Sequence, residues 1–161
     1  MTIKTTRRVA ITAASLAFAL LSGTAYAATI NGTPGNDTLN GTSAGDYIYG
    51  KGGDDHITPK GGHDYAYGGA GDDVLTDFWR ADGSDPVARD WFYGGIGADT
   101  IYASARDQVW GGAGNDKVVL AYAGAGTLVD CGRGFDRLVS NQPLVGVTRR
   151  NCERVRIVSA G

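Results

Sequence analysis

The sequence predicts an all-β fold, a parallel β-roll in which short strands and turns wind into a right-handed β-helix solenoid, and three regularities predict it. An aspartate returns every nine residues at Asp37, Asp46, Asp55, Asp64 and Asp73. Glycines crowd the positions in front of each aspartate, and an apolar residue follows two positions after it. The glycines permit sharp turns, and the apolar residue indicates a strand of about three residues. Such a strand is too short to be stable alone, so stacked neighbours must bury it.

Residues 1–27 have the pattern of a secretory signal peptide. A basic start with Lys4, Arg7 and Arg8 precedes an uncharged stretch rich in Ala, Leu and Ile, and Ala25-Tyr26-Ala27 is a small-x-small cleavage site. A permanent membrane anchor is the alternative, but the apolar stretch is shorter than the roughly 20 residues that a spanning helix needs. We therefore expect a secreted, extracellular protein without a membrane span in the mature chain, exported by the general secretory route or the twin-arginine route.

Nine-residue units fill the β-roll region, which we place at residues 28–130. The clearest copies, residues 68–76, 94–102 and 111–119, read GGAGDDVLT, GGIGADTIY and GGAGNDKVV, and looser copies occupy residues 32–67. These copies resemble the calcium-binding nonapeptide of RTX (repeats-in-toxin) proteins, also known as the hemolysin-type repeat. The tail with two cysteines, VDCGRGFD and NCERV, is similar to that of free-standing secreted bacterial members. The resemblance implies a β-roll with calcium in its turns.

The stacking of these units brings carboxylates together. Two nonads complete one coil, so aspartates of repeats two apart stack at the strand spacing of roughly 5 Å and repel one another. Carboxylates and carbonyls in flexible turns suit Ca²⁺, whereas Mg²⁺ demands a tighter octahedron and Zn²⁺ prefers nitrogen or sulfur. Several calcium ions are therefore the predicted cofactor. The alternative is that Asp, Asn and Gly simply form turns without a metal.

The resemblance implies that each ion lies between turns of repeats two apart, where aspartates at the sixth position and nearby carbonyls hold it. Carried over to this chain, the metal ligands are Asp37, Asp46, Asp55, Asp64, Asp73, Asp90, Asp99, Asp107 and Asp116. The expected pairs are Asp37 with Asp55, Asp55 with Asp73, Asp46 with Asp64, and Asp99 with Asp116. Asp90 and Asp107 follow turns that lack the glycines of the repeat.

An irregular insertion at residues 77–93 interrupts the repeats. Residues 85–93 fit the nonad with Pro86 and Ala88 in place of glycines, so the segment is predicted to be either a disguised coil or a loop. The rhythm resumes at Asp99, which predicts two calcium-binding blocks rather than one uniform array. In residues 120–129, Leu128 keeps the apolar position while Gly126 takes the aspartate position, so we expect no ion there.

Residues 131–161 are predicted to cap the solenoid. The chain has two cysteines, and an even count in a secreted protein predicts a disulfide between Cys131 and Cys152. A metal-binding or reactive pair is the alternative, but neither cysteine has a CxxC partner or a neighbouring histidine. Val155 and Ile157, which alternate with arginines, predict a closing strand over the last open edge.

Charge and motif content narrow the function. Residues 37–116 contain fourteen aspartates against five Lys and Arg, and the basic residues further on form no aromatic-basic motif, so nucleic-acid binding is not expected. No GxSxG, HExxH or phosphate-binding loop is present, and we expect no enzyme. The prediction is a secreted calcium-binding module, structural or interacting in role, that folds when it binds Ca²⁺.

Two alternatives stay open. Tyr47, Tyr49, Tyr65 and Tyr67, with Tyr102 beside them, are predicted to project from one sheet. They form either a strip that binds a cell surface or polysaccharide, as in an adhesin or glycan-binding module, or a cross-strand ladder that stabilises the coils. The second alternative is a small extracellular hydrolase that uses Asp82 or Asp90 in the irregular insertion.

Overall fold

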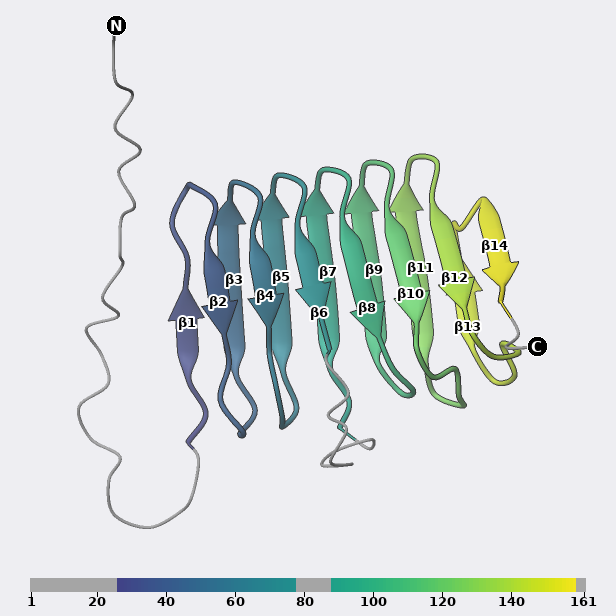
Figure 1. Ribbon diagram of the computed structural model, residues 1–161, viewed down its shortest axis with the longest axis horizontal. Coiled ribbons are helices and arrows are strands. Elements are labelled where there is room, and N and C mark those ends of the chain that lie inside the picture. The colour runs from purple at the N-terminus through teal and green to yellow at the C-terminus, as the bar shows by residue number, and fades with distance from the viewer. Residues whose placement is uncertain (1–25, 78–87, 159–161) are drawn as a thin grey trace, which may run out of the picture.

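The computed structural model describes residues 26–77 and 88–158, which form the predicted parallel β-roll (Figure 1). One seven-stranded sheet has the order β1-β3-β5-β7-β9-β11-β13, and the other has the order β14-β12-β10-β8-β6-β4-β2. The odd-numbered strands are β1 (Thr29–Asn31), β3 (Tyr47–Gly52), β5 (Tyr65–Ala70), β7 (Trp91–Ile96), β9 (Gln108–Ala113), β11 (Leu128–Arg133) and β13 (Thr148–Arg150). The even-numbered strands are β2 (Thr38–Asn40), β4 (His56–Thr58), β6 (Val74–Thr76), β8 (Thr100–Ala103), β10 (Lys117–Leu120), β12 (Arg137–Ser140) and β14 (Arg154–Ile157).

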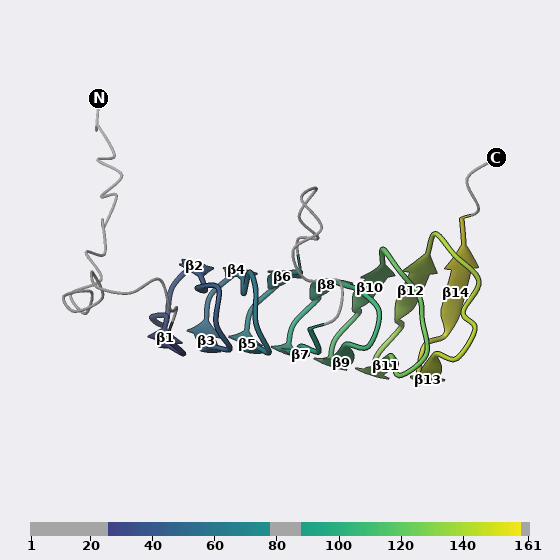
Figure 2. The same cartoon turned by 90° about the horizontal axis from the view of Figure 1, so that it is seen from below.

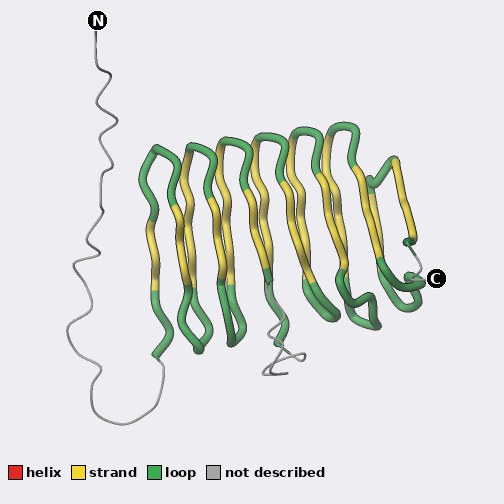
Figure 3. Tube along the Cα trace, viewed as in Figure 1, coloured by secondary structure: helices red, strands yellow, loops and turns green. Residues whose placement is uncertain are grey.

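Each coil contains one strand of each sheet and two turns, as the nine-residue period predicts. Figure 2 shows the two sheets as facing layers, and Figure 3 shows strands alternating with turns along the described trace. Ile48, Ala66, Phe92, Val109 and Val129 lie in register along the odd-numbered sheet, and all are fully buried. The alternating apolar residue therefore forms the core between the layers.

The irregular insertion does not interrupt the stack. β5 pairs directly with β7 and β6 pairs directly with β8, so the chain between Thr76 and Trp91 connects two strands of a single coil. The repeat phase predicted for residues 85–93 is confirmed at its described end, because Phe92 pairs with Ala66 and the N–H of Asp64 donates to Asp90 as in the regular repeats. The two predicted blocks form one continuous stack. A turn of a solenoid lies outside both sheets, and extra residues there leave the strand register unchanged.

Some predictions concern segments outside the described residues. These segments contain residues 1–25 of the predicted signal peptide and Asp82 of the hydrolase alternative, so both stay predictions. Within the described ranges, no helix is long and apolar enough to span a membrane.

The coil at residues 120–129 differs from the prediction by one residue. Leu128 pairs with Gln108 and is half-buried, whereas Val129 pairs with Val109 and is fully buried. Thr127, and not Gly126, therefore takes the aspartate position. The cause is the length of the preceding segment: Leu128 follows Lys117 by 11 residues, whereas Tyr65 follows His56, at the equivalent positions, by 9.

The last strand and the disulfide close the stack as predicted. β14 extends the even-numbered sheet beside β12, with Val155 opposite Leu138. Cys131 and Cys152 form a disulfide with a Cα–Cα distance of 5.2 Å. Because Cys131 is buried within β11, this bond ties the final coil to the core.

Aromatic side chains form two stacked ladders on the outer face of the odd-numbered sheet. One contains Tyr47, Tyr65 and Trp91, and the other contains Tyr49, Tyr67, Tyr93 and Trp110. Their ring centroids lie 4.4–5.0 Å apart with interplanar angles of 3–9°. Neighbouring rings therefore cover one another's faces, which confirms the cross-strand ladder. Tyr102 lies on β8 in the other sheet, so its predicted place in the strip is wrong.

Candidate metal centres in the turns

Aspartates form a column along the turns that lead from odd-numbered to even-numbered strands, at the upper edge in Figure 1. In each step the backbone N–H of one aspartate donates to Oδ1 of the aspartate one coil further on. These bonds join Asp37 to Asp55, Asp55 to Asp73, Asp73 to Asp99, Asp99 to Asp116 and Asp116 to Asp136, at 2.7–2.9 Å. Glu153 ends the column, because its Oε2 accepts the N–H of Asp136 at 2.8 Å.

A second column lies along the opposite turns, at the lower edge in Figure 1. The same type of bond joins Asp46 to Asp64, Asp64 to Asp90 and Asp90 to Asp107, at 2.6–3.1 Å. In the next coil the Thr127 hydroxyl accepts the N–H of Arg106 at 2.8 Å. An uncharged hydroxyl therefore stands at the position where we expect no ion.

The structure brings together all four predicted aspartate pairs. It also pairs Asp73 with Asp99 across the insertion, because the stack is continuous there. Asp136 and Glu153 were missed as candidate ligands. Asp136 carried a signal, since Leu138 follows two residues later as in the repeats, whereas Glu153 is not an aspartate and follows Asp136 by only 17 residues.

The second carboxylate oxygen distinguishes two kinds of turn. In Asp55, Asp73, Asp99, Asp116 and Asp136, Oδ2 is buried and has no hydrogen-bond partner. We call the turns that hold these five aspartates open turns. In the first four, Oδ2 lies beside the first glycine of its own turn, where a side chain would meet both Oδ2 and a backbone carbonyl oxygen of the next coil. Carboxylate and carbonyl oxygens therefore converge on the space left by the absent side chain, and such oxygens suit Ca²⁺.

Three other turns, which we call closed turns, satisfy the aspartate with their own hydroxyl residue. The N–H and hydroxyl of Thr33 both donate to Oδ2 of Asp37, at 2.5 and 2.9 Å. Thr42 donates its N–H to Oδ2 of Asp46 and its hydroxyl to Oδ1. Ser104 donates its N–H and hydroxyl to Oδ2 of Asp107, at 2.7 and 3.3 Å. In these turns the oxygen already has protein donors.

The backbone φ angle of the second residue in the turn differs between open and closed turns. In the five open turns this residue has positive φ, and the residues are Lys51, Gly69, Gly95, Gly112 and Gly132. In the closed turns Thr33, Thr42 and Ser104 have no positive φ. A β-branched threonine is particularly unfavourable at positive φ. The side chain at this position therefore favours one of the two turn geometries.

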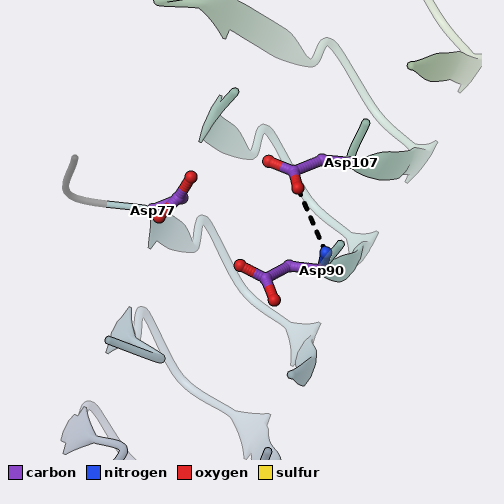
Figure 4. A group of neighbouring side chains, drawn as sticks. All are labelled: Asp77, Asp90 and Asp107. Atoms are coloured by element: carbon purple, nitrogen blue, oxygen red, sulfur yellow. Dashed lines mark hydrogen bonds between the residues drawn. The ribbon is translucent and has the colours of Figure 1, made fainter. Parts of the chain in front are cut away.

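A third arrangement lies among the lower turns, beside the end of β6. Asp77, Asp90 and Asp107 each offer one carboxylate oxygen, and these oxygens lie within 4.8 Å of one another (Figure 4). Asp90 and Asp107 were predicted as ligands. Asp77 was missed, although it begins a turn where the two preceding turns begin with Gly41 and Pro59. Three converging carboxylates offer the hard oxygen ligands that Ca²⁺ prefers.

Burial makes these carboxylates difficult to ionise. The pKa is raised to about 6 for Asp73 and Asp116, to about 7 for Asp99 and Asp107, and to about 9 for Asp90, and burial is the largest cause in each case. Neighbouring carboxylates raise these pKa values further, and for Asp90 the charge of Asp107 is the second cause. Backbone N–H donors oppose the rise. A cation beside the carboxylates would favour their ionised form.

Carboxylates stacked in the turns of a parallel solenoid define a metal-binding repeat protein. The chain belongs to the RTX calcium-binding nonapeptide repeat family, whose model matches residues 22–58, 60–76 and 88–118, more than half of the sequence. The family confirms the resemblance and establishes calcium binding by the repeats. The comparison with curated proteins found no match. Asp136 and Glu153 lie beyond the matched segments.

Proposed function

We propose that the protein is a secreted structural or interaction module whose β-roll folds when calcium fills the open turns of Asp55, Asp73, Asp99 and Asp116, and that it is not an enzyme. The observation that carries this proposal is the row of buried Oδ2 atoms without hydrogen-bond partners at Asp55, Asp73, Asp99 and Asp116. An ionised carboxylate that is buried without a partner strongly opposes folding. Bound calcium supplies the compensating positive charge, so its binding free energy becomes folding free energy.

The oxygen donors in the turns fit calcium. At Gly68, for example, Oδ2 of Asp73 and the carbonyl oxygen of Gly94 both approach the place that a side chain would fill. Calcium accepts carboxylate and carbonyl oxygens in irregular geometry. The proposed ligands are Asp55, Asp64, Asp73, Asp99 and Asp116 in the stacked turns, with Asp90 and Asp107 in their cluster with Asp77. Asp37 and Asp46, whose carboxylates accept bonds from Thr33 and Thr42, contribute less.

Secretion is supported by three observations. RTX repeat proteins are typically secreted, and a disulfide such as Cys131–Cys152 persists in oxidising compartments. The residues directly after the predicted cleavage site belong to the β-roll, since the N–H of Ala28 donates to Asp46 and β1 starts at Thr29. The proposal that the chain is not an enzyme is supported by the absence of the catalytic sequence motifs considered above.

Calcium titration tests this function. We expect the mature chain in chelator to have the circular dichroism of an unordered chain, and added calcium to restore β structure with a stoichiometry of several ions by calorimetry. Magnesium at the same concentration should not replace calcium, because it demands a tighter octahedral site. A chain that is fully folded in chelator and binds no calcium would contradict the proposal.

A matched pair of variants tests the role of the open turns. Asp73→Asn removes a carboxylate whose Oδ2 has no hydrogen-bond partner, so we expect fewer bound ions and a calcium midpoint about tenfold higher. Asp37→Asn changes the same residue type in a turn closed by Thr33, and we expect it to keep the wild-type number of ions. Equal calorimetric stoichiometry in both variants would show that open and closed turns do not differ in calcium binding.

A second candidate function, glycan binding, is favoured by a hollow beside the end of one aromatic ladder. Trp110 is the last ring of that ladder, and its neighbour on β11 is Asp130. A shallow open hollow of about 420 Å³ lies there, with Trp110, Asp130, Arg133 and Asn151 in its lining. An aromatic ring with polar groups around it can stack on a sugar and bond to its hydroxyls.

Retention on insoluble polysaccharide or cell wall tests this candidate. We expect Trp110→Ala to abolish retention of the calcium-loaded chain. Tyr49→Ala is the matched control. Tyr49 is the first ring of the same ladder and stacks on one neighbouring ring, as Trp110 does, but it does not line the hollow. Equal loss of retention in both variants would point to the ladder's stability rather than to a sugar site, and no retention of the wild type would exclude this candidate.

A further inference from the structure

The carboxylate column continues beyond the nonapeptide repeats into the disulfide-closed cap. Asp136 is fully buried, and its Oδ1 accepts the N–H of Asp116 at 2.7 Å. Arg154 pairs with Arg137, which puts Glu153 at the aspartate position of the last coil. Oε2 of Glu153 accepts the N–H of Asp136 at 2.8 Å, just as Oδ1 of each earlier aspartate accepts the N–H of the coil before it. Asp136 and Glu153 therefore repeat the carboxylate pairing of the earlier coils.

The turn of Asp136 shares the positive φ and the unpartnered Oδ2 of the other open turns, although Cys131 stands at the first position, where those turns have glycine. Its second residue, Gly132, has a φ of 102°, close to the 118° of Gly112 in the preceding coil. Oδ2 of Asp136 is buried without a hydrogen-bond partner. Nothing in this turn plays the part of Thr42, whose N–H and hydroxyl satisfy Asp46. One carboxylate oxygen is thus left for a ligand that the protein itself does not supply.

The disulfide ties together the two segments that carry this pair. Cys131 stands at the first position of the Asp136 turn, where the preceding turn has Gly111, and its partner Cys152 directly precedes Glu153. The bond therefore restricts the separation of Glu153 from Asp136. An exposed glutamate at a chain end would otherwise sample many positions, and ordering it would cost conformational entropy.

We propose that Asp136 and Glu153 form a further calcium site in the cap, held together by the Cys131–Cys152 disulfide. The inference rests on the proposed calcium-dependent function and extends it to residues outside the matched repeats. The two carboxylates offer the hard oxygen ligands that Ca²⁺ prefers. Glu153 is exposed, so this site is the solvent-facing end of the array.

Calcium calorimetry on matched variants of the full mature chain tests the cap site. Glu153→Gln alters an exposed side chain that the core does not need, and we expect one bound ion fewer than in the wild type with unchanged circular dichroism in calcium. Asp130→Asn removes one negative charge from β11, next to the cap and outside the column, and we expect wild-type stoichiometry. Asp136→Asn should lose the same ion as Glu153→Gln. Reduction of the disulfide should weaken that ion's binding selectively.

The outcomes separate this site from the general function. If Glu153→Gln and Asp136→Asn both keep the wild-type number of ions while chelator still unfolds the chain, the cap site is wrong and the proposed function stands. If Asp130→Asn loses an ion as Glu153→Gln does, the effect is one of net charge and the assignment is also wrong. If the wild type binds no calcium, both proposals fall together.

Discussion

Acidification is expected to restore the β-roll of the calcium-free chain. A carboxyl group whose pKa is higher in the folded than in the unfolded state binds its proton more tightly when folded. Its contribution to stability is complete below the unfolded pKa of about 4 and is lost as the pH rises through the folded pKa. That folded pKa is about 6 for Asp73 and Asp116 and about 7 for Asp99. The calcium-free chain should therefore gain stability as the pH falls from about 7 to about 4.

The measurement is far-UV circular dichroism of the chain freed of calcium on a chelating resin, recorded across this pH range. Calcium-loaded protein is the control, and its stability should instead fall on acidification, because protons compete with calcium for the same oxygens. Asp99→Asn replaces an ionisable group by a neutral one of similar shape. It should raise the β content of the calcium-free chain at neutral pH and flatten its pH dependence. A chain that stays unordered down to pH 4 contradicts the expectation.

The nine-residue period predicted the fold well because it fixes the strand register directly. Two periods make one coil, so Asp37 had to stack on Asp55 and Ile48 on Ala66, and the structure places both pairs in register. The period predicted the position of the buried residues less accurately where a turn differed in length. The longer turn before β11 moved Val129 into the core in place of Leu128. The sequence of a turn does not show how many residues the turn will contain, because the pairing of the two flanking strands determines that number.

The candidate sites were predictable in kind but not atom by atom. The spacing identified the aspartates, yet it could not show that Oδ2 of Asp73 lacks a donor while Oδ2 of Asp37 has two. That difference depends on the backbone angle of the second turn residue, for which Thr33 in place of glycine was the available signal. Asp77 joins Asp90 and Asp107 only through the fold, because twelve residues lie between Asp77 and Asp90 and the nine-residue period does not continue across them.

Gly112→Ala is expected to open the stack between β7 and β9. Gly112 has a φ of 118°, and an added Cβ would meet the carbonyl oxygen of Gly95 and lie 2.9 Å from both the nitrogen and the carbonyl carbon of that residue. All three contacts are backbone atoms of the neighbouring coil, so no side-chain rotation can relieve them. Because β7 and β9 are hydrogen-bonded through this region, relief requires the coils to separate.

The expected loss is on the order of 4 kcal/mol in the free energy of unfolding in calcium, since the change combines an unfavourable φ with a backbone clash. Gly52→Ala is the matched control, because Gly52 lies in the same sheet without positive φ and its added Cβ would find its nearest atom 3.6 Å away. It should change stability by about 0.5 kcal/mol or less. Denaturant unfolding of both variants measures the difference. Each coil contacts only its neighbours, so the coils on either side of Gly112 should unfold separately in the Gly112→Ala chain. We therefore expect two unfolding transitions for Gly112→Ala and one for Gly52→Ala. A Gly112→Ala chain as stable as the Gly52→Ala chain would mean that the coils are not packed as closely as this backbone requires.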